Sequence, residues 1–389
     1  MDKFDTFIPY GRQHIDQADI DAVIDVLKSD YLTQGPKVPA FENALCQLTG
    51  AEFACAANSA TSALHIACLA LGVTSEDIVW TSPISFVASS NCALYCDAKV
   101  DFVDIDVDTG LMSTQALKQK LIQAKDLGQL PKVVIPVHLC GHSCDMEGIH
   151  QLSQEYGFNI IEDASHAVGS RYQGKPVGNC QYSDISVFSF HPVKIVTSAE
   201  GGVGLTNDKN LHNLMTKYRS HGITTNPSEM TEASHGPWYY QQIMLGFNYR
   251  MTELQATLGV SQLNKLSKLV ELRNEKAKVY DDAFADTPLT VLKPCEQSYS
   301  AYHLYVVLLP KEKANAHKEI IESMRAANIC AHLHYIPIHT QPYYKSLGFA
   351  ESDFPSSLDY YQRAISIPLY PDLSEEAQQF IISTLKSLL

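Results

Sequence analysis

The stretch "SVFSFHPVKIVTSAEGGVG" (residues 186–204) places one lysine, Lys194, between an apolar run and a turn of small residues. The apolar run is typical of a buried strand, and "GVGLT" (residues 202–206) is typical of the strand that follows it. Lysine side chains are mostly exposed, so Lys194 taken alone indicates only a surface charge. In a parallel sheet, however, ligands bind outside the carboxyl ends of the strands, which is where Lys194 would lie.

Further apolar runs before this stretch alternate with helical patterns. The runs expected to form strands are "DIVWTS" (77–82), "KVDFVDI" (99–105), "KVVIPVHL" (132–139), "FNIIEDA" (158–164) and "DISVFSF" (184–190), besides 202–206. In "NSATSALHIACLALG" (58–72), Ser59 is expected to cap a helix and Gly72 to end it. An earlier helix is predicted by the spacing of Ile20, Val23, Ile24 and Leu27. This alternation predicts an α/β fold with a mainly parallel sheet flanked by helices.

The C-terminal third shows a different pattern. From Thr252 to about Ala285 the sequence predicts one unusually long helix that leads into a second domain. That domain would hold the strand "AYHLYVVLLP" (301–310), the helix "HKEIIESMRAANI" (317–329) and a last helix from about Ser374. A chain of 389 residues exceeds the usual size of a single core. We therefore expect a large domain over residues 1–260, with an N-terminal arm, and a linking helix with a smaller α+β domain over residues 261–389.

Composition excludes several classes of partner. Lys and Arg number 29 against 43 Asp and Glu, and the net charge of −14 opposes binding to nucleic-acid phosphates. The N-terminus resembles no targeting segment, and the chain has no run of about 18 apolar residues. The ten cysteines are scattered, which suits reduced thiols better than a disulfide framework. We expect a soluble, cytoplasmic protein with no nucleic-acid or membrane partner.

Three features at the predicted strand ends and helix starts fit one cofactor. Pyridoxal phosphate needs a lysine for its Schiff base, a carboxylate beside its pyridine nitrogen and an anion site for its phosphate. Lys194, Asp163 at the end of "NIIED", and the helix start at Thr61 and Ser62 could supply these groups. Each has a plainer alternative, because Asp is common in caps and turns, and Thr and Ser are ordinary capping residues.

Three motifs carry a resemblance to a known family. "EDASHAVGS", "SFHPVKIVTSAEGG" and "GFNYRMTELQAT", in this order and spacing, resemble the DegT-type aminotransferases, fold-type I pyridoxal phosphate enzymes that act on nucleotide-linked keto sugars. The resemblance implies that Lys194 is the catalytic lysine and Asp163 the partner of the pyridine nitrogen. It also implies that the Asn248 position is supplied by the neighbouring subunit, and hence a homodimer with shared active sites. The other cofactor-binding positions it implies are Thr61, Ser62, Phe86, His166 and Ser189.

The wording "FSFHPVK" narrows the resemblance within the family. It is similar to members that use L-glutamate to aminate C4 of UDP-2-acetamido-2,6-dideoxy-β-L-arabino-hexos-4-ulose, a step towards pseudaminic acid. Substrate contacts are expected from Tyr31, His191, Arg250 and His334. The alternatives are another nucleotide-linked 3- or 4-keto sugar, a pyridoxal phosphate sugar dehydratase, in which histidine replaces the lysine, or a catalytically silent sugar-binding protein. One departure is Ala199, where many family members have glycine.

Two histidine clusters remain. "HLCGHSC" presents His138, Cys140, His142 and Cys144 at alternate positions, which would point to opposite faces of an extended segment. Structural zinc sites usually use paired ligands instead, so we predict no metal site. In "HLHYIPIH", His332, His334 and His339 are candidates for sugar or nucleotide contact, with ordinary loop histidines as the alternative.

Overall fold

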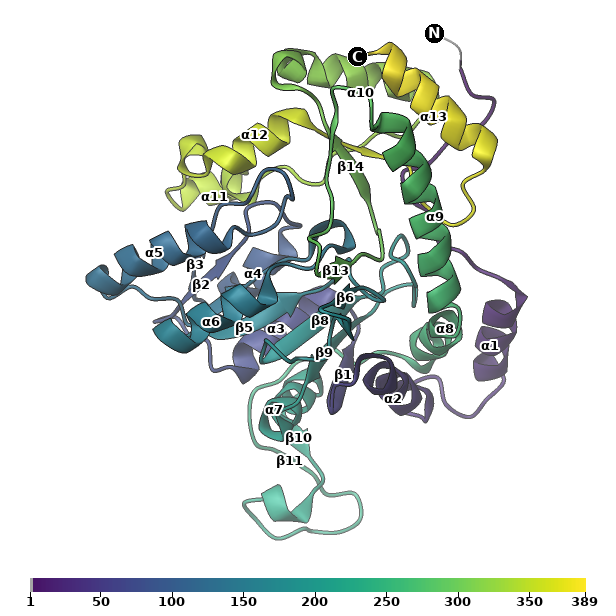
Figure 1. Cartoon of the computed structure of the whole chain (residues 1–389). Coiled ribbons are helices and arrows are strands. Elements are labelled where there is room, and N and C mark those ends of the chain that lie inside the picture. The colour runs from purple at the N-terminus through teal and green to yellow at the C-terminus, as the bar shows by residue number, and fades with distance from the viewer. Residues whose placement is uncertain (1–2) are drawn as a thin grey trace.

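The computed structural model describes residues 3–389 and centres on a seven-stranded sheet (Figure 1). The strand order is β1-β9-β8-β5-β4-β2-β3, and β9 alone runs antiparallel to the others. The strands are β1 (Phe53–Ala57), β2 (Ile78–Thr81), β3 (Lys99–Phe102), β4 (Val133–Ile135), β5 (Asn159–Asp163), β8 (Ile185–Ser189) and β9 (Gly202–Thr206). The predicted mainly parallel sheet is confirmed, and six of its strands fall on the predicted runs. The sequence did not reveal β1, because "FACAA" is rich in alanine, which is depleted in strands.

Helices cover both faces of this sheet (Figure 1). Successive strand residues point to opposite faces, so Val133 and Ile135 pack in one core cluster while Val134 packs in another. The first cluster joins the sheet to α3, α4 and α7, and the second joins it to α5 and α6. The helices are α1 (Gln17–Leu27), α2 (Lys37–Thr49), α3 (Ala60–Ala70), α4 (Ala88–Leu94), α5 (Thr114–Leu127), α6 (Met146–Tyr156) and α7 (Lys209–Arg219).

The C-terminal part builds a second core around a three-stranded antiparallel sheet. Its strands are β12 (Thr290–Val291), β14 (Tyr305–Leu308) and β15 (Ala364–Ile367). Its helices are α10 (His317–Ala326), α11 (Pro342–Ser346), α12 (Pro355–Arg363) and α13 (Glu375–Ser387). The predicted strand, helix and last helix are confirmed, the last with Ser374 as its N-cap. Two further small sheets pair β10 (Ile223–Thr224) with β11 (Gln241–Gln242), and β6 (Arg171–Tyr172) with β7 (Lys175–Pro176) and β13 (Ser298–Tyr299).

The single long helix predicted from Thr252 to about Ala285 is wrong. The structure divides it into α8 (Glu253–Leu263) and α9 (Leu266–Phe284), with the break at residues 264–265. At this break the Lys265 amino group bonds to Asp19 of α1 at 2.5 Å, and Gln262 bonds to the same carboxylate at 2.8 Å. Leucines on either side of the break keep a helical spacing, so the apolar pattern did not reveal it.

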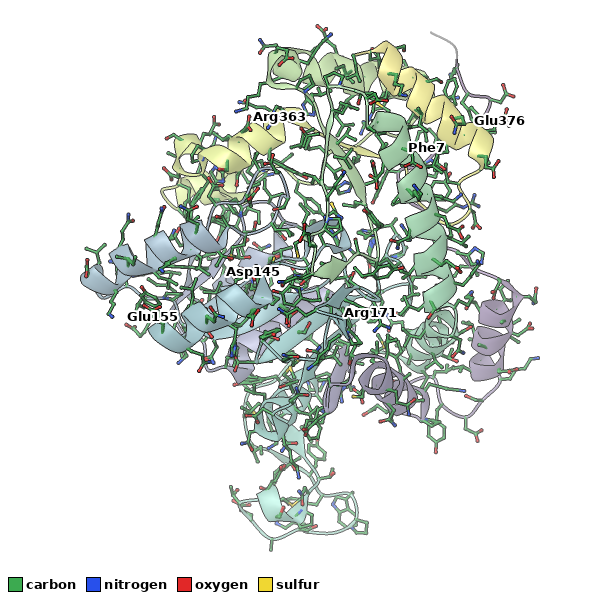
Figure 2. The ribbon with its side chains drawn as sticks, viewed as in Figure 1. Phe7, Asp145, Glu155, Arg171, Arg363 and Glu376 are labelled. Atoms are coloured by element: carbon green, nitrogen blue, oxygen red, sulfur yellow. The ribbon has the colours of Figure 1, made fainter. Side chains whose placement is uncertain are left out.

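The helix α9 connects the two cores. Its first turns pack in the cluster around α2, whereas Tyr280 and Phe284 pack in the C-terminal core. The N-terminal arm joins this same C-terminal core: Ile8 is buried and pairs with Ile329, and the Phe4 ring lies 5.2 Å from that of Phe380 in α13. Figure 2 labels exposed Phe7 on this arm. The division at residue 260 stays an interpretation, and that residue lies inside α8.

The cysteines and the apolar character of the helices bear on the expectations about disulfides and membrane spans. Seven of the ten cysteines are buried and three are half-buried, all of them with free thiols. Between residues 3 and 389, no helix combines the length and the apolar character needed to cross a membrane.

Ala199, where many family members have glycine, has a backbone conformation that favours glycine. Its φ is +65°, in the left-handed region that costs an L-residue about 1–2 kcal/mol and that glycine adopts freely. Because the side chain is exposed, Ala199→Gly removes no packing. We expect this change to raise the free energy of unfolding by about 0.5–1 kcal/mol in urea denaturation. Ala285→Gly, at an exposed position with φ −53°, is the matched control and should lower it; two variants with equal effects would contradict the assignment of strain to Ala199.

Candidate active site

A cavity of about 870 Å³ opens where the carboxyl ends of β5 and β8 meet the N-terminus of α3. This volume lies in the range of sites that enclose small molecules and cofactors. The C-terminal part supplies one wall through the segment from His332 to Ile336. The structure brings together at this cavity the predicted residues Thr61, Ser62, Phe86, Asp163, His166, Ser189, His191, Lys194, His332 and His334.

Lys194 lies in the turn that follows β8 and lines the cavity. Its backbone N–H donates to the carbonyl of His191 at 2.9 Å, which fixes the turn. Burial lowers the pKa of Lys194 to about 8, and the charge of Asp163 partly offsets this effect. A larger fraction of the amine is therefore neutral near physiological pH than for an exposed lysine, and the neutral amine is the nucleophile that attacks a carbonyl.

This lowered pKa predicts how the cofactor-free enzyme captures pyridoxal phosphate. Only the neutral amine reacts, so the capture rate should rise about tenfold per pH unit below the pKa of about 8 and level off above it. Stopped-flow absorbance on mixing cofactor-free enzyme with pyridoxal phosphate, between about pH 6 and about pH 10, measures this profile. A rate that keeps rising towards 10.5, the ordinary lysine value, would contradict the burial effect.

Asp163 is the last residue of β5, and its carboxylate is buried and held on both oxygens. Oδ2 accepts a hydrogen bond from the Ser89 hydroxyl at 2.6 Å, and Oδ1 accepts one from the backbone N–H of Ser165 at 3.2 Å. Two donors fix the orientation of the carboxylate at the cavity wall. A fixed, buried carboxylate is the group needed to keep a pyridine nitrogen protonated.

The N-terminus of α3 has the features of an anion site. Ser59, as predicted, is the N-cap and accepts a hydrogen bond from the N–H of Ser62 at 3.1 Å. The helix start lies directly on β9, because Gly202 has no side chain: a Cβ there would be 2.3 Å from the Ala60 nitrogen. Helix N-termini favour anions through unpaired N–H groups and the helix dipole. Thr61, Ser62 and Ser189, all with hydroxyl groups, line the same cavity.

An aromatic and an imidazole complete the predicted cofactor environment. Phe86 is 59% exposed, yet its exposed ring lines the cavity, as expected for a ring that stacks on a bound planar group. His166 is buried, and its Nε2 lies 3.2 Å from the Tyr335 hydroxyl. Burial, with the charges of Lys194 and His334, holds the pKa of His166 well below its ordinary value. His166 is therefore a neutral imidazole beside the lysine.

Three aromatic residues are among the cavity residues that the sequence did not reveal. His303 lies with its ring 4.3 Å from that of His166, and Tyr335 follows His334 in the wall. Tyr10 reaches the cavity from the N-terminal arm, with its ring 5.0 Å from that of His334. A histidine inside the apolar strand pattern "AYHLYVV" was the only sequence signal for His303.

Four other predicted residues do not line this cavity. Tyr31 is 55% exposed, and Asn248 and Arg250 pair through their backbones with Ser220 and Ala57. His339 is fully buried beside Phe354, and its ring bonds to the carbonyl of Glu351, so it makes no cavity wall. At the rim, His191 is half exposed, 3.9 Å from Glu200.

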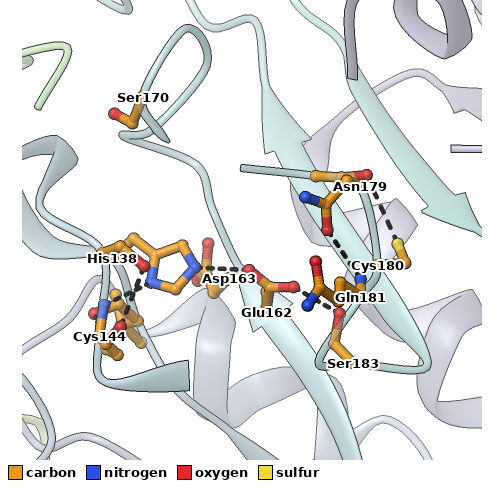
Figure 3. A network of polar contacts seen from close by, with 12 residues as sticks. His138, Cys144, Glu162, Asp163, Ser170, Asn179, Cys180, Gln181 and Ser183 are labelled. Carbon is orange, nitrogen blue, oxygen red and sulfur yellow. Dashed lines mark hydrogen bonds and ion pairs between the residues drawn. The ribbon is translucent and has the colours of Figure 1, made fainter. Parts of the chain in front are cut away.

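The "HLCGHSC" run serves the fold. His138 lies 2.7 Å from the Glu162 carboxylate through Nε2, and its Nδ1 accepts a hydrogen bond from the backbone N–H of Cys144 (Figure 3). Within residues 3–389, no three His, Cys, Asp or Glu side chains are grouped so as to hold a metal ion.

A lysine of lowered pKa, a buried carboxylate and a helix N-terminus around one cavity of an α/β fold define a fold-type I pyridoxal phosphate enzyme. The family comparison agrees: the model of the DegT/DnrJ/EryC1/StrS aminotransferase family matches residues 13–386. The chain belongs to this family and is a pyridoxal phosphate-dependent aminotransferase.

Three relatives, two of them with solved structures, are similar to this chain over nearly its full length. A Campylobacter jejuni protein named UDP-4-amino-4,6-dideoxy-N-acetyl-beta-L-altrosamine transaminase is 38% identical, covering 98% of this chain and 97% of its own length. Helicobacter pylori PseC, an aminotransferase of pseudaminic acid biosynthesis, is 35% identical with a TM-score of 0.90, covering 98% of this chain and 99% of its own. The pyridoxal phosphate form of a putative Streptococcus pneumoniae sugar aminotransferase is 28% identical with a TM-score of 0.88, covering 98% of each chain.

Proposed function

We propose that the protein transfers an amino group from L-glutamate to the C4 keto group of a UDP-linked 4-keto-6-deoxy-N-acetyl sugar. The sugar is UDP-2-acetamido-2,6-dideoxy-β-L-arabino-hexos-4-ulose, and the product lies on the way to pseudaminic acid. The observation that carries the proposal is the 38% identity, over nearly the full length of both chains, to a transaminase named for this amino sugar. The lysine, the carboxylate and the anion site that such a reaction needs line one cavity.

Each residue of the site has its own role in binding the cofactor or moving a proton. The α3 N-terminus would hold the cofactor phosphate, Phe86 would pack against the ring, and Asp163 would keep the pyridine nitrogen protonated; all three line the cavity. When bound, pyridoxal phosphate supplies an electron sink for the substrate carbon. Lys194 would anchor the cofactor, and its Nζ, when free as an amine, would be the base that takes up and returns the proton at the substrate carbon. Neutral His166 leaves the lysine as the basic group on that side of the cavity.

The wall formed by the C-terminal part and by Tyr10 of the N-terminal arm is the place for the sugar. Tyr10, His332 and His334 form an aromatic group, with the rings of the two histidines 4.7 Å apart. Burial, with the charges of His332 and Lys194, lowers the pKa of His334 to about 3, so its ring is neutral at physiological pH. The neutral imidazole of His334 and the phenol of Tyr10 can exchange hydrogen bonds with sugar hydroxyl and acetamido groups without adding charge. His191 and Glu200 at the rim are placed to contact the part of the substrate outside the cavity.

A panel of nucleotide sugars tests the substrate class. The enzyme, pyridoxal phosphate and L-glutamate would be incubated separately with UDP- and dTDP-linked 4-keto and 3-keto sugars, and the products weighed by mass spectrometry. Amination of the UDP-linked 4-keto sugar, with little of the others, is the expected result. Amination of a dTDP-linked sugar alone would overturn the proposed substrate and leave the aminotransferase class intact.

We further propose a homodimer with shared active sites. Asn248 and Arg250 lie outside the cavity of their own chain, and apolar side chains are exposed on two elements. On α1 these are Ile20, Ile24 and Leu27, and around the β10–β11 hairpin they are Trp238, Tyr240 and Leu245. Exposed apolar groups in such number are typical of a subunit interface. A second copy covering them would bring its Asn248 to the phosphate site of the first.

Mixing two inactive variants tests the shared site. Lys194→Ala chains carry Asn248, and Asn248→Ala chains carry Lys194, so a mixed dimer regains one complete site. Unfolding and refolding the two variants together should restore about a quarter of wild-type activity, because about half of the dimers are mixed and each has one of two sites. A mixture as inactive as its parts, with a dimer present in light scattering, would contradict the shared site.

A further inference from the structure

His138, the first histidine of "HLCGHSC", is bonded to its surroundings in three ways. Its backbone N–H donates to the carbonyl of Asp163 at 3.0 Å. Its Nε2 faces the Glu162 carboxylate at 2.7 Å, and its Nδ1 accepts a hydrogen bond from the N–H of Cys144 at 3.1 Å (Figure 3). Because Nδ1 is an acceptor, the Nε2 nitrogen carries the proton and donates to Glu162. The fully buried side chain of His138 thus connects the loop after β4 to Glu162, and its backbone connects the same loop to Asp163.

Glu162 lies on the side of β5 opposite Asp163, since neighbouring strand residues point to opposite faces. Its carboxylate is buried away from the cavity, and its second oxygen accepts a hydrogen bond from the Ser183 hydroxyl at 2.5 Å. Both oxygens of a buried charge are therefore satisfied, as Figure 3 shows. Removing either partner would leave part of that charge unpaired directly beside Asp163.

The position of Asp163 depends on these contacts. Its backbone is held on one side by the carbonyl of Pro136, which accepts from the Asp163 N–H at 2.9 Å, and on the other by His138. Among residues 3–389 its side chain has Ser89 and the Ser165 N–H as partners, which orient the carboxylate but do not fix the strand end. A shift of about 1 Å at a reacting group can cost roughly a hundredfold in rate.

We propose that His138 is a positioning residue for transamination: its ring, bonded to Glu162 and to the Cys144 N–H, holds the end of β5 so that the Asp163 carboxylate stays aligned with the pyridine nitrogen. This rests on the proposed role of Asp163. The "HLCGHSC" run then serves the reaction through its first histidine. His142, in the same run, is equally buried, but neither of its ring nitrogens is hydrogen-bonded within the described chain, which makes it a matched control.

The test compares His138→Phe, which keeps a ring and removes both side-chain bonds, with His138→Gln, whose amide can still donate to Glu162. His142→Phe is the control, and Ser183→Ala removes the other Glu162 partner if His138→Phe fails to fold. Three quantities are measured: the rate constant of the half-reaction with glutamate alone, glutamate affinity, and the pH midpoint of the lysine-linked cofactor absorbance. A pyridine nitrogen that loses its proton no longer lowers the pKa of that linkage, so misalignment of Asp163 moves the midpoint upward.

We expect His138→Phe to lower the rate constant roughly tenfold to a hundredfold, with glutamate affinity little changed and the midpoint raised. His138→Gln should recover most of the rate, and His142→Phe should match the wild type. A lowered melting temperature with wild-type rate and midpoint would overturn the proposal, as would equal effects from His142→Phe. Asp163→Asn is the positive control: if it leaves the midpoint unchanged, the role of Asp163 and this inference both fail. Failure to aminate a UDP-sugar affects only the proposed substrate, because the half-reaction uses glutamate alone.

Discussion

Lys194→Ala is expected to abolish turnover, lowering kcat by roughly 10⁴-fold or more. The change removes both the amine that anchors the cofactor and the group that moves the proton, and no other lysine lines the cavity among the described residues. The absorbance of the lysine-linked cofactor should disappear as well. Cofactor added in excess should still bind, because the α3 N-terminus and Phe86 remain.

Spectra with pyridoxal phosphate and steady-state turnover with glutamate and the keto sugar measure these effects. Lys268→Ala, which removes a surface lysine paired with Glu271, is the control and should match the wild type. A Lys194→Ala enzyme that kept normal multiple turnover would remove the basis for the whole site. Loss of activity together with loss of the folded state would instead point to a structural role for Lys194, and circular dichroism separates the two cases.

Asp163→Asn is expected to have the second-largest effect, a fall of roughly a hundredfold to a thousandfold in kcat. Asparagine keeps the size of the side chain and its contact with Ser89, but its neutral amide no longer stabilises a protonated pyridine nitrogen. The electron sink is weakened in both half-reactions. The lysine linkage itself should still form, because Lys194 is untouched.

Single-turnover rates with glutamate and then with the keto sugar test this directly. Both rates should fall by similar factors, since the same ring serves both steps. Asp101→Asn, on β3 of the same sheet, is the control and should leave both rates unchanged. A wild-type rate in Asp163→Asn would mean that another group holds the nitrogen proton, which would contradict the assigned role.

The parts of the site that lie next to strand ends and helix starts could be predicted from the sequence. Lys194 and Asp163 each follow an apolar run, and the order of strands in an α/β fold brings those ends to one edge of the sheet. The Ser59 cap was recognisable because capping depends on residues within one turn. Such features depend on residues that are close in the sequence, so the sequence pattern predicts them.

The remaining features depend on contacts between distant segments. Tyr10 reaches the cavity only because the N-terminal arm packs on the C-terminal core, more than three hundred residues further along the chain, where Ile8 pairs with Ile329. The break between α8 and α9 depends on bonds from Lys265 to α1, which no helical periodicity encodes. The bond between His138 and Glu162 likewise joins two segments 24 residues apart, whereas the sequence offered only the alternating histidines and cysteines of "HLCGHSC".

At Ala199 the resemblance to the family identified an unusual residue, but only the backbone shows what is unusual about the position. Its positive φ explains why glycine suits this position. The substitution lies in the turn beyond Lys194 and alters no cavity residue. The motif identified the position, and the positive φ gives the physical reason why glycine is usual there.

The most direct test of the proposed function follows one nitrogen atom. The enzyme with pyridoxal phosphate would receive UDP-2-acetamido-2,6-dideoxy-β-L-arabino-hexos-4-ulose and L-glutamate labelled with nitrogen-15, and the product would be examined by mass spectrometry and NMR. The labelled nitrogen should appear on C4 of the sugar, with one 2-oxoglutarate formed for each amino sugar. An unlabelled product, a label on C3, or loss of a sugar hydroxyl without amination would contradict the account.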